Sequence, residues 1–226
     1  MEIAHTYYIS INPKKIERME KHILPPHFTP EQYTRISGIE GTKLNPAQLH
    51  KQNVITKHGL QLFVQRGQPY GTLGCYLAHC RLWDYIHKKH ASTDNILILE
   101  DDIEIDPDFH NKFKKLTTPE NLPPQVKWDI IYYDHNTVLG TPLNRFYTIP
   151  HNHSPAGTNA FLSCYLIKVA SIPKLLKICT PIGQTPNQFA IDSVMRNNFH
   201  KINALFYNNH LAKQRKELGS CRIGRN

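Results

Sequence analysis

The sequence predicts a single α/β domain, in which a mostly parallel β-sheet is flanked by helices. Apolar segments of strand length alternate with segments whose apolar residues recur every three or four positions. The run at residues 96–99 is apolar throughout, as in strands that are covered on both faces. A chain of 226 residues also suits one domain of roughly 200 residues, so residues 1–226 are expected to fold as one unit.

The N-terminal third predicts a strand, a helix and a second strand. Residues 5–11 are rich in Tyr and Ile and stop at an Asn-Pro turn pair. Over residues 14–24 the apolar side chains fall at helical spacing, and a Pro-Pro pair ends the run. Residues 33–36 predict a second short strand, whereas residues 40–66 are polar and are expected to be irregular or briefly helical.

The clearest predicted helix spans residues 72–87, because Leu73, Leu77, Cys80 and Trp83 repeat at helical spacing. The apolar strand at 96–99 follows it. Further strands are predicted at 129–133, 145–149, 161–167 and 203–207, and further helices at 171–179 and 187–198. Strands that alternate with helices in this way imply a layered sheet.

The formal net charge of +9 favours polyanionic partners, namely nucleic acid, an anionic membrane face or a diphosphate-bearing substrate. The densest positive cluster forms a basic tail from about residue 212, which could lie on phosphate or lipid head groups or simply be solvated. Its basic residues are Lys213, Arg215, Lys216, Arg222 and Arg225.

Cysteine usage and hydropathy point to a cytoplasmic protein. The five cysteines are odd in number and contain no C-x-x-C pair, which argues against a disulfide framework and against a cysteine-rich zinc site. The start of the chain lacks a basic segment followed by an apolar core, and no stretch approaches the roughly 20 apolar residues of a membrane span. Peripheral contact with the inner face of a membrane, through the basic tail, is compatible with this expectation.

Three adjacent acids, Glu100, Asp101 and Asp102, follow the apolar strand directly. Ligands of open α/β sheets bind beyond the carboxyl ends of the strands. Adjacent carboxylates repel one another, and a divalent cation relieves this repulsion. Because alternate residues of an extended chain project in similar directions, Glu100 and Asp102 are the candidate ligands of Mn²⁺ or Mg²⁺. An exposed acidic turn is the alternative.

Two longer motifs favour one class of protein. The segment GTLGCYLAHCRLWDYI at 71–86, followed by DNILILEDDIEIDPDF at 94–109, resembles the signature of glycosyltransferase family 25, the lipooligosaccharide and collagen galactosyltransferase family. The segments YYISINPKKIERM, RISGIEGTKL and CYLIKVASIPKLL match the family as well. Thr72 and Ala78 depart from it, because Glu and Ser are common at these positions, so details of donor or acceptor binding could differ.

The resemblance implies a Rossmann-like domain of GT-A type and an inverting, metal-assisted transfer. The donor would be a UDP-sugar, most often UDP-galactose, and the acceptor a glycan or glycolipid such as lipooligosaccharide. The resemblance also places Ile11, Asn12, Arg18, Ser37 and Gly38 near the nucleotide, and Gly74, His79 and Asp101 are further candidates for binding the donor. Simpler explanations compete at four of these positions: Arg18 as a solvated helix residue, Ser37 and Gly38 as a turn, and His79 as a wall or core histidine.

Inversion also requires a general base opposite the leaving group. Asp192 matches a late Asp of the family and is the expected base, although an Asp near a helix start is favourable there in any case. Asp134, beside His135, is the runner-up. Cys75 is expected to be a packed small residue rather than a nucleophile.

Two other classes of protein compete with a glycosyltransferase. A nucleic-acid-binding or metal-dependent nucleic-acid-processing protein would suit the basic charge. However, no RNP, helix-turn-helix or zinc-finger pattern is present, and an acidic triplet repels phosphate unless a metal intervenes. Only Asp134 and Asp192 could complete a two-metal site. The other class is a catalytically inactive scaffold that keeps the fold.

Overall fold

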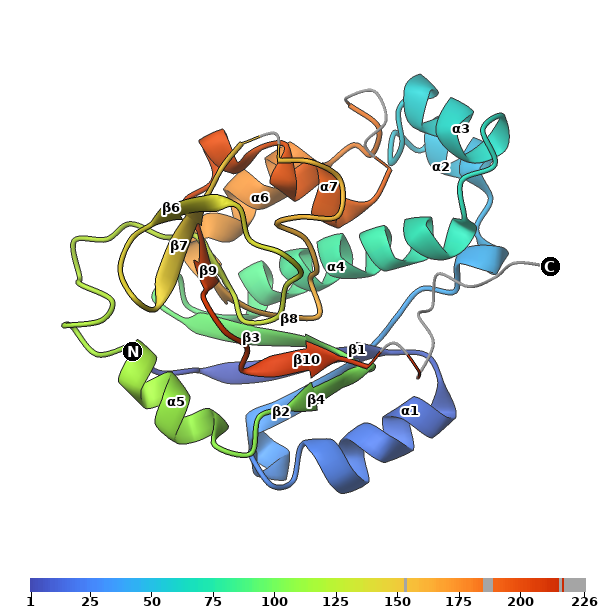
Figure 1. Cartoon of the computed structure of the whole chain (residues 1–226). Helices are drawn as coiled ribbons and strands as arrows, with labels where there is room; N and C mark the ends of the chain where they lie inside the picture. The colour runs from blue at the N-terminus through green and yellow to red at the C-terminus, as the bar shows by residue number, and fades with distance from the viewer. Residues whose placement is uncertain (153, 185–188, 216, 218–226) are drawn as a thin grey trace.

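The structure, a computed structural model, describes residues 1–152, 154–184, 189–215 and 217. Its centre is an eight-stranded sheet with the strand order β2-β1-β3-β8-β5-β9-β7-β6 (Figure 1). The strands of this sheet are β1 (His5–Ser10), β2 (Tyr33–Ser37), β3 (Asn95–Glu100), β5 (Ile130–Tyr132), β6 (Gly140–Pro142), β7 (Tyr147–Pro150), β8 (Cys164–Lys168) and β9 (Ala204–Tyr207). A small second sheet pairs β4 (Ile103–Ile105) with β10 (Ala212–Gln214).

The main sheet is mixed. Strand β1 is parallel to β2 and β3, and β5 is parallel to β9. Strand β8 runs antiparallel between β3 and β5, while β7 is antiparallel to both β9 and β6. Since β3 and β5 both oppose β8, they point the same way, and the carboxyl ends of β1, β2, β3, β5 and β9 share one edge of the sheet. The predicted α/β class is confirmed, with antiparallel strands added at β8 and at the β7-β6 side.

Helices cover both faces of the sheet (Figure 1). One face carries α4, α6 and α7, and the other carries the segment 13–24 and α5. The helices are α1 (Pro13–Arg18), which continues as a π-helical turn (Met19–Ile23), α2 (Pro46–Lys51), α3 (Lys57–Val64), α4 (Tyr70–Lys89), α5 (Phe109–Leu116), α6 (Ile172–Cys179) and α7 (Ile191–Arg196).

Burial on both faces explains the apolar run of β3. Ile96 and Ile98 belong to the core beneath α4, whereas Leu97 and Leu99 belong to the core on the opposite face. Each buried aliphatic side chain of this kind contributes roughly 1.5–3 kcal/mol. The last residue of the strand, Glu100, continues the alternation and therefore faces α4.

Several elements differ from the prediction. Residues 40–66 contain two helices, α2 and α3, and α7 is shorter than predicted, with residues 185–188 outside the described part. Strands β4, β6 and β10 and helix α5 had no predicted counterpart. Strand β10 corrects the expectation of a tail from residue 212, because Gln214 pairs with Ile103 of β4. These strands have only three residues each, too few to give a clear periodicity.

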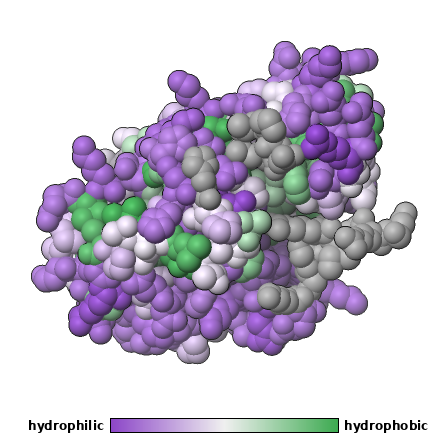
Figure 2. Space-filling model, turned by 45° about the horizontal axis from the view of Figure 1, so that its top comes forward, coloured by the Kyte–Doolittle hydropathy of each residue, from purple (hydrophilic) through white to green (hydrophobic). Residues whose placement is uncertain are grey.

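The face of the molecule drawn in Figure 2 is mainly hydrophilic. Figure 2 shows hydrophobic residues only in small separate areas of the face in view. No helix in the described ranges is long and apolar enough to cross a bilayer. Of the predicted basic cluster, Lys213 is exposed and Arg215 forms ion pairs with Glu104 and Glu217. Lys216, Arg222 and Arg225 lie outside the described residues, so the structure does not bear on the predicted membrane contact.

Candidate functional site

An open pocket lies where β1 and β3 end side by side. The loops after β1, β2 and β3 form one side of it, and the first turns of α4 form the other. Its lining residues are Ile9, Ser10, Ile11, Gly38, Ile39, Cys75, Ala78, His79, Glu100, Asp101 and Asp102. All three acids of the triplet therefore reach one pocket at the carboxyl edge of the sheet, as predicted. Asp101 and Asp102 form a turn rather than an extension of the strand.

Asp101 joins the two strand ends. Its Oδ2 accepts a hydrogen bond of 2.5 Å from Ser10 Oγ, and its Oδ1 lies 3.1 Å from Lys15 Nζ. Asn12 positions this lysine, because its side-chain oxygen caps α1 and accepts from the backbone N–H of Lys14 and Lys15. The ion pair with Lys15 offsets the negative charge of Asp101.

Asp102 is only 4% exposed and incompletely satisfied. Its Oδ2 accepts a 3.0 Å hydrogen bond from Gln214 Nε2, whereas its Oδ1 is buried with no hydrogen-bond partner among the described residues. Burial, reinforced by the charge of Glu100, raises the pKa of this carboxyl to about 6, although Lys15 and Gln214 oppose the shift. A buried oxygen without a partner, beside a second carboxylate, fits a hard divalent cation such as Mn²⁺ or Mg²⁺.

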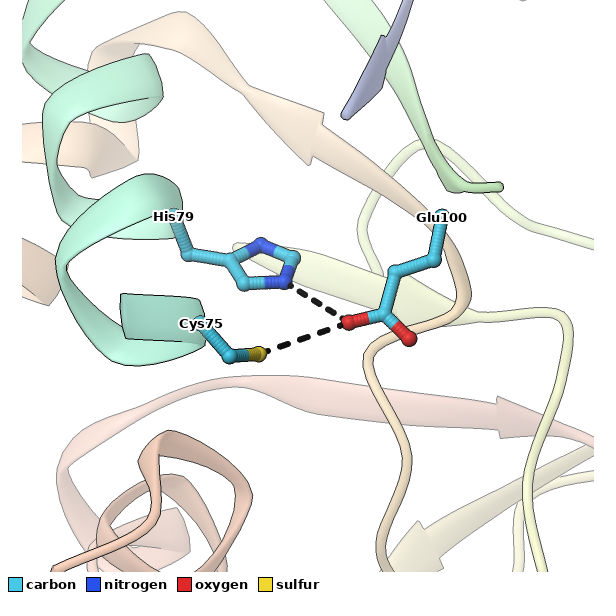
Figure 3. Close-up of side chains that lie close together, drawn as sticks. All are labelled: Cys75, His79 and Glu100. Carbon is cyan, nitrogen blue, oxygen red and sulfur yellow. Dashed lines mark hydrogen bonds and ion pairs between the residues drawn. The ribbon is translucent and has the colours of Figure 1, made fainter. Parts of the chain in front are cut away.

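Glu100 points from the end of β3 toward α4 (Figure 3). Its Oε1 lies 3.2 Å from His79 Nε2 and 3.5 Å from Cys75 Sγ. Figure 3 shows the other carboxylate oxygen turned away from both side chains. Cys75 and His79 stand one helical turn apart on α4, so a single helix supplies both contacts.

A chain of buried polar groups stands behind His79, which is 1% exposed. Its Nδ1 lies 2.9 Å from Tyr165 Oη, and the same oxygen accepts a 2.8 Å hydrogen bond from Trp83 Nε1. An indole N–H can only donate, so the Tyr165 hydroxyl is left to donate its own proton to His79 Nδ1. The ring proton of His79 is then on Nε2 and faces Glu100. This arrangement fixes the direction in which the Glu100 carboxylate points.

Two glycines allow close packing around the pocket. A Cβ added at Gly74 would lie 2.3 Å from the carbonyl oxygen of Ile39, so α4 approaches the loop after β2 more closely than any side chain permits. At Gly38 an added Cβ would first meet the side chain of Ile11, at 3.0 Å. The Gly38 N–H donates to Ser10 O, which joins the loops after β1 and β2.

Four predicted donor contacts, Ser37, Arg18, Asn12 and Gly74, do not line the pocket. Ser37 is exposed, and its hydroxyl donates to the carbonyl oxygen of Gly38 at 3.4 Å. Arg18 donates to Ile103 O at 2.9 Å and lies 3.8 Å from Glu104, on the opposite face of the sheet from α4. Asn12 acts as the cap of α1. Gly74 supports the pocket wall without being part of it.

The runner-up base, Asp134, follows β5 and is 2% exposed. Its Oδ2 accepts from Ser163 Oγ at 2.5 Å and from the backbone N–H of Gln214 at 3.0 Å, and its Oδ1 lies 3.3 Å from His210 Nδ1. Because the Gln214 side chain also donates to Asp102, this one residue bridges the two acids. Asp134 does not line the pocket.

The expected base, Asp192, lies in the first turn of α7 and is half-buried. Its Oδ1 accepts from the backbone N–H of Ser193 at 2.8 Å. Its charge also acts on Tyr132, whose pKa is raised first by burial and then by Cys179 and Asp192. Asp192 does not line the pocket, so its assignment as the base stays a prediction.

Sequence reasoning missed several partners of the acids. Ser10 ends β1 at the same edge as Glu100, so the argument that selected the triplet could have found it. Lys15 follows a recognisable Asn-Pro helix start and could have been proposed as a counter-ion. Gln214 and Ser163 offered no signal, because their roles depend on the β10-β4 pairing and on the antiparallel placement of β8.

A sequence profile described as "Glycosyltransferase family 25 (LPS biosynthesis protein)" matches residues 4–195 of this chain. The chain belongs to glycosyltransferase family 25. The matched range contains every residue that lines the pocket, together with Asp134 and Asp192.

Family 25 relatives match this chain over short segments. Human procollagen galactosyltransferase 2 is 27% identical over 99 residues, which cover 43% of this chain and 15% of the human protein. A family 25 member of Drosophila pseudoobscura pseudoobscura is 25% identical over 137 residues, 59% of this chain and 21% of that protein. A rat protein named probable inactive glycosyltransferase 25 family member 3 is 25% identical over 111 residues, 46% and 18% of the two chains. This chain therefore spans about a fifth of the length of these relatives.

Solved structures resemble the chain more distantly. Mouse xyloside xylosyltransferase 1, in its apo form, aligns over 88% of this chain and 82% of its own, with 10% identity and a TM-score of 0.40. The apo glycosyltransferase GlyE of Streptococcus pneumoniae aligns over 90% of this chain and 45% of its own, with 10% identity and a TM-score of 0.39.

Proposed function

We propose that this family 25 chain is an inverting glycosyltransferase that transfers galactose from UDP-galactose to a glycan or glycolipid such as lipooligosaccharide, assisted by Mn²⁺ or Mg²⁺. The observation that carries the proposal is the buried Oδ1 of Asp102, which has no hydrogen-bond partner in the described part of the chain and shares a pocket with Glu100. The galactosyltransferase names of relatives support the choice of sugar.

Glu100 and Asp102 are the residues that would hold the metal ion, whose charge neutralises a diphosphate as it leaves. Asp101 is paired with Lys15 and bonded to Ser10, so its role is to hold the loop after β3 against the loop after β1. Gly38 and Ile11 also line the pocket, where backbone and apolar surface are available to the nucleoside.

Direct displacement at the anomeric carbon needs a base that faces the acceptor hydroxyl. Asp134 is poorly suited, because Ser163 and Gln214 already donate to its Oδ2 and His210 Nδ1 lies 3.3 Å from its Oδ1. We therefore keep Asp192 as the proposed base. It would act on an acceptor that lies between the pocket and α7.

A donor screen tests the proposal. Metal-free protein is incubated with each common UDP-sugar, with Mn²⁺ or with EDTA, and release of UDP is followed without and with a glycan acceptor. The expected result is Mn²⁺-dependent UDP release from UDP-galactose, slow without acceptor. Equal release in EDTA would contradict the metal site. Silence with every UDP-sugar, together with no thermal shift on adding a donor, would contradict the donor class.

No feature of the described residues favours the nucleic-acid alternative. A two-metal site would need Asp134 or Asp192 close to the triplet, and neither lines the pocket. The rat relative, whose name calls it a probable inactive family member, supports keeping the inactive-scaffold alternative. If no UDP were released in the donor screen, either with Mn²⁺ or with EDTA, the result would favour the inactive scaffold.

A further inference from the structure

We propose that Cys75, His79 and Glu100 form a binding site for a thiophilic divalent cation such as Zn²⁺. The site shares Glu100 with the proposed Mn²⁺ or Mg²⁺ site, but its other two ligands, a thiolate and an imidazole, are of a different chemical class. Sulfur and imidazole ligands favour Zn²⁺ over hard ions, which prefer carboxylate and phosphate oxygens.

The geometry suits such an ion. The three ligand atoms, Cys75 Sγ, His79 Nε2 and a Glu100 carboxylate oxygen, all lie within 4.8 Å of one another. Zn²⁺ bonds of roughly 2.0–2.3 Å in a tetrahedral arrangement separate ligand atoms by roughly 3.3–3.7 Å. The observed separations from Glu100 Oε1 are 3.5 Å to the sulfur and 3.2 Å to the nitrogen, so small side-chain movements would complete the site (Figure 3).

The surroundings also resemble those of a metal site. Three protein ligands leave a fourth position, and the cluster lines the pocket that holds Asp102, with its buried and unpartnered Oδ1. Behind the imidazole, Tyr165 contacts His79 Nδ1, and Trp83 fixes Tyr165. Outer groups of this kind hold the ring of a metal-binding histidine in place.

Binding has a defined proton balance. In the hydrogen-bonded state, Cys75 S–H and His79 Nε2–H both donate to Glu100. When the cation binds, the thiol proton leaves to solvent and the ring proton moves from Nε2 to Nδ1, where Tyr165 Oη accepts it. A single proton is therefore released for each cation bound, and the metal replaces both hydrogen bonds to Glu100.

A cation at this site occupies Glu100, so Zn²⁺ should compete with Mn²⁺ and inhibit Mn²⁺-supported sugar transfer. Only this consequence rests on the proposed function. The binding itself can be measured whether or not the protein transfers sugar.

The test uses Co²⁺ as a spectroscopic stand-in for Zn²⁺, with the full-length protein in a Cys221→Ser background. The expected result is a thiolate-to-cobalt charge-transfer absorption that Zn²⁺ abolishes by displacement. Cys75→Ser should remove this absorption, and Cys80→Ala, on the same helix but packed in the core, should keep it. Tyr165→Phe should lower the Zn²⁺ affinity about 10–100-fold, as expected for loss of a group behind a ligand.

Calorimetry in two buffers of different ionisation enthalpy should show release of a single proton per Zn²⁺. Absence of the charge-transfer band in folded protein would overturn the proposal and leave Cys75 and His79 as hydrogen-bonded supports for Glu100. A band that survives Cys75→Ser would also overturn it. Failure of sugar transfer alone would affect only the proposed function, because the absorption is measured without donor or acceptor.

Discussion

At the scale of single residues, three adjacent acids have three different environments. Glu100 accepts from side chains of α4, Asp101 is ion-paired with Lys15, and Asp102 is buried with one oxygen unpartnered. These acids have different partners because Glu100 ends a strand and the two aspartates form a turn, so successive side chains point in different directions. Of the three, Asp102 is the one that the proposed metal ion would complete.

Asp129 predicts a pH-dependent contribution to stability. Burial alone would raise the pKa of this carboxyl, but Lys174, the Asn203 N–H and Ser171 together outweigh burial and lower it. A lowered folded-state pKa stabilises the protein above the unfolded value of 3.8, and this contribution is lost as the pH falls through the folded value. Asp129→Asn should therefore lower the free energy of unfolding by about 1–3 kcal/mol at pH 7.

Urea unfolding of wild type and Asp129→Asn, from pH 7 down toward pH 3, measures this effect. The difference between the two proteins should be constant near neutrality and shrink as the wild-type carboxylate is protonated. A difference that is absent at pH 7, or that stays constant at acid pH, would show that the Asp129 charge is not what joins β5 to α6.

Some residues of the pocket could be named from the sequence, whereas the distant partners of the acids could not. The triplet was identifiable because three acids directly follow an apolar strand, Gly38 was named through the family resemblance, and His79 was named as a donor-site candidate on the predicted helix. All five residues line the pocket. The partners that decide the state of each acid, such as Gln214 and Ser163, come from distant segments. Their positions depend on strand pairings that local periodicity does not encode.

At the scale of elements, the contact between α4 and the loop at 39–41 shapes the pocket. Gly74→Ala should lower the free energy of unfolding by about 1–3 kcal/mol, because the new Cβ would lie 2.3 Å from Ile39 O and 2.9 Å from Gly41 N. The steric cost of the new Cβ should exceed the gain of about 1 kcal/mol that comes from the higher helix propensity of Ala relative to Gly. Chemical denaturation measures the change.

Gly38→Ala is the matched control, since its Cβ would first meet the Ile11 side chain, at 3.0 Å, which can move. Its effect on stability should be smaller than that of Gly74→Ala. If Gly74→Ala were as stable as wild type, α4 would not be held against the loop by a backbone contact.

Long elements were predicted well, and short ones were not. Helix α4 and strand β3 have strong patterns over many residues, and both were placed to within two residues at each end. Strands β4 and β10 have three residues each and exist because they pair with each other across about 100 residues of sequence. Such pairing is a property of the tertiary fold. The contact between Gln214 and Asp102 depends on this pairing, so it could not be predicted from the sequence.

At the scale of the whole molecule, the order of strands explains the location of the site. The α/β class followed from alternating strands and helices, but nothing local to residues 164–168 shows that β8 inserts antiparallel between β3 and β5. That insertion keeps β3 and β5 in the same direction and brings Asp134 to the edge that carries the triplet. The sheet thereby collects acids from two parts of the chain around Gln214.

The central claim is that Asp102 holds a divalent metal ion that sugar transfer requires. The most direct test is Mn²⁺ titration of UDP release from UDP-galactose by metal-free wild type, by Asp102→Asn and by the exposed control Asp108→Asn. Asp102→Asn should lose Mn²⁺-dependent release by more than about 100-fold, since the metal contributes several kcal/mol to the transition state. Its free energy of unfolding should be equal to wild type or greater, because a buried carboxyl with a raised pKa is removed. Asp108→Asn should behave as wild type. Full Mn²⁺-dependent turnover in a folded Asp102→Asn variant would contradict the account.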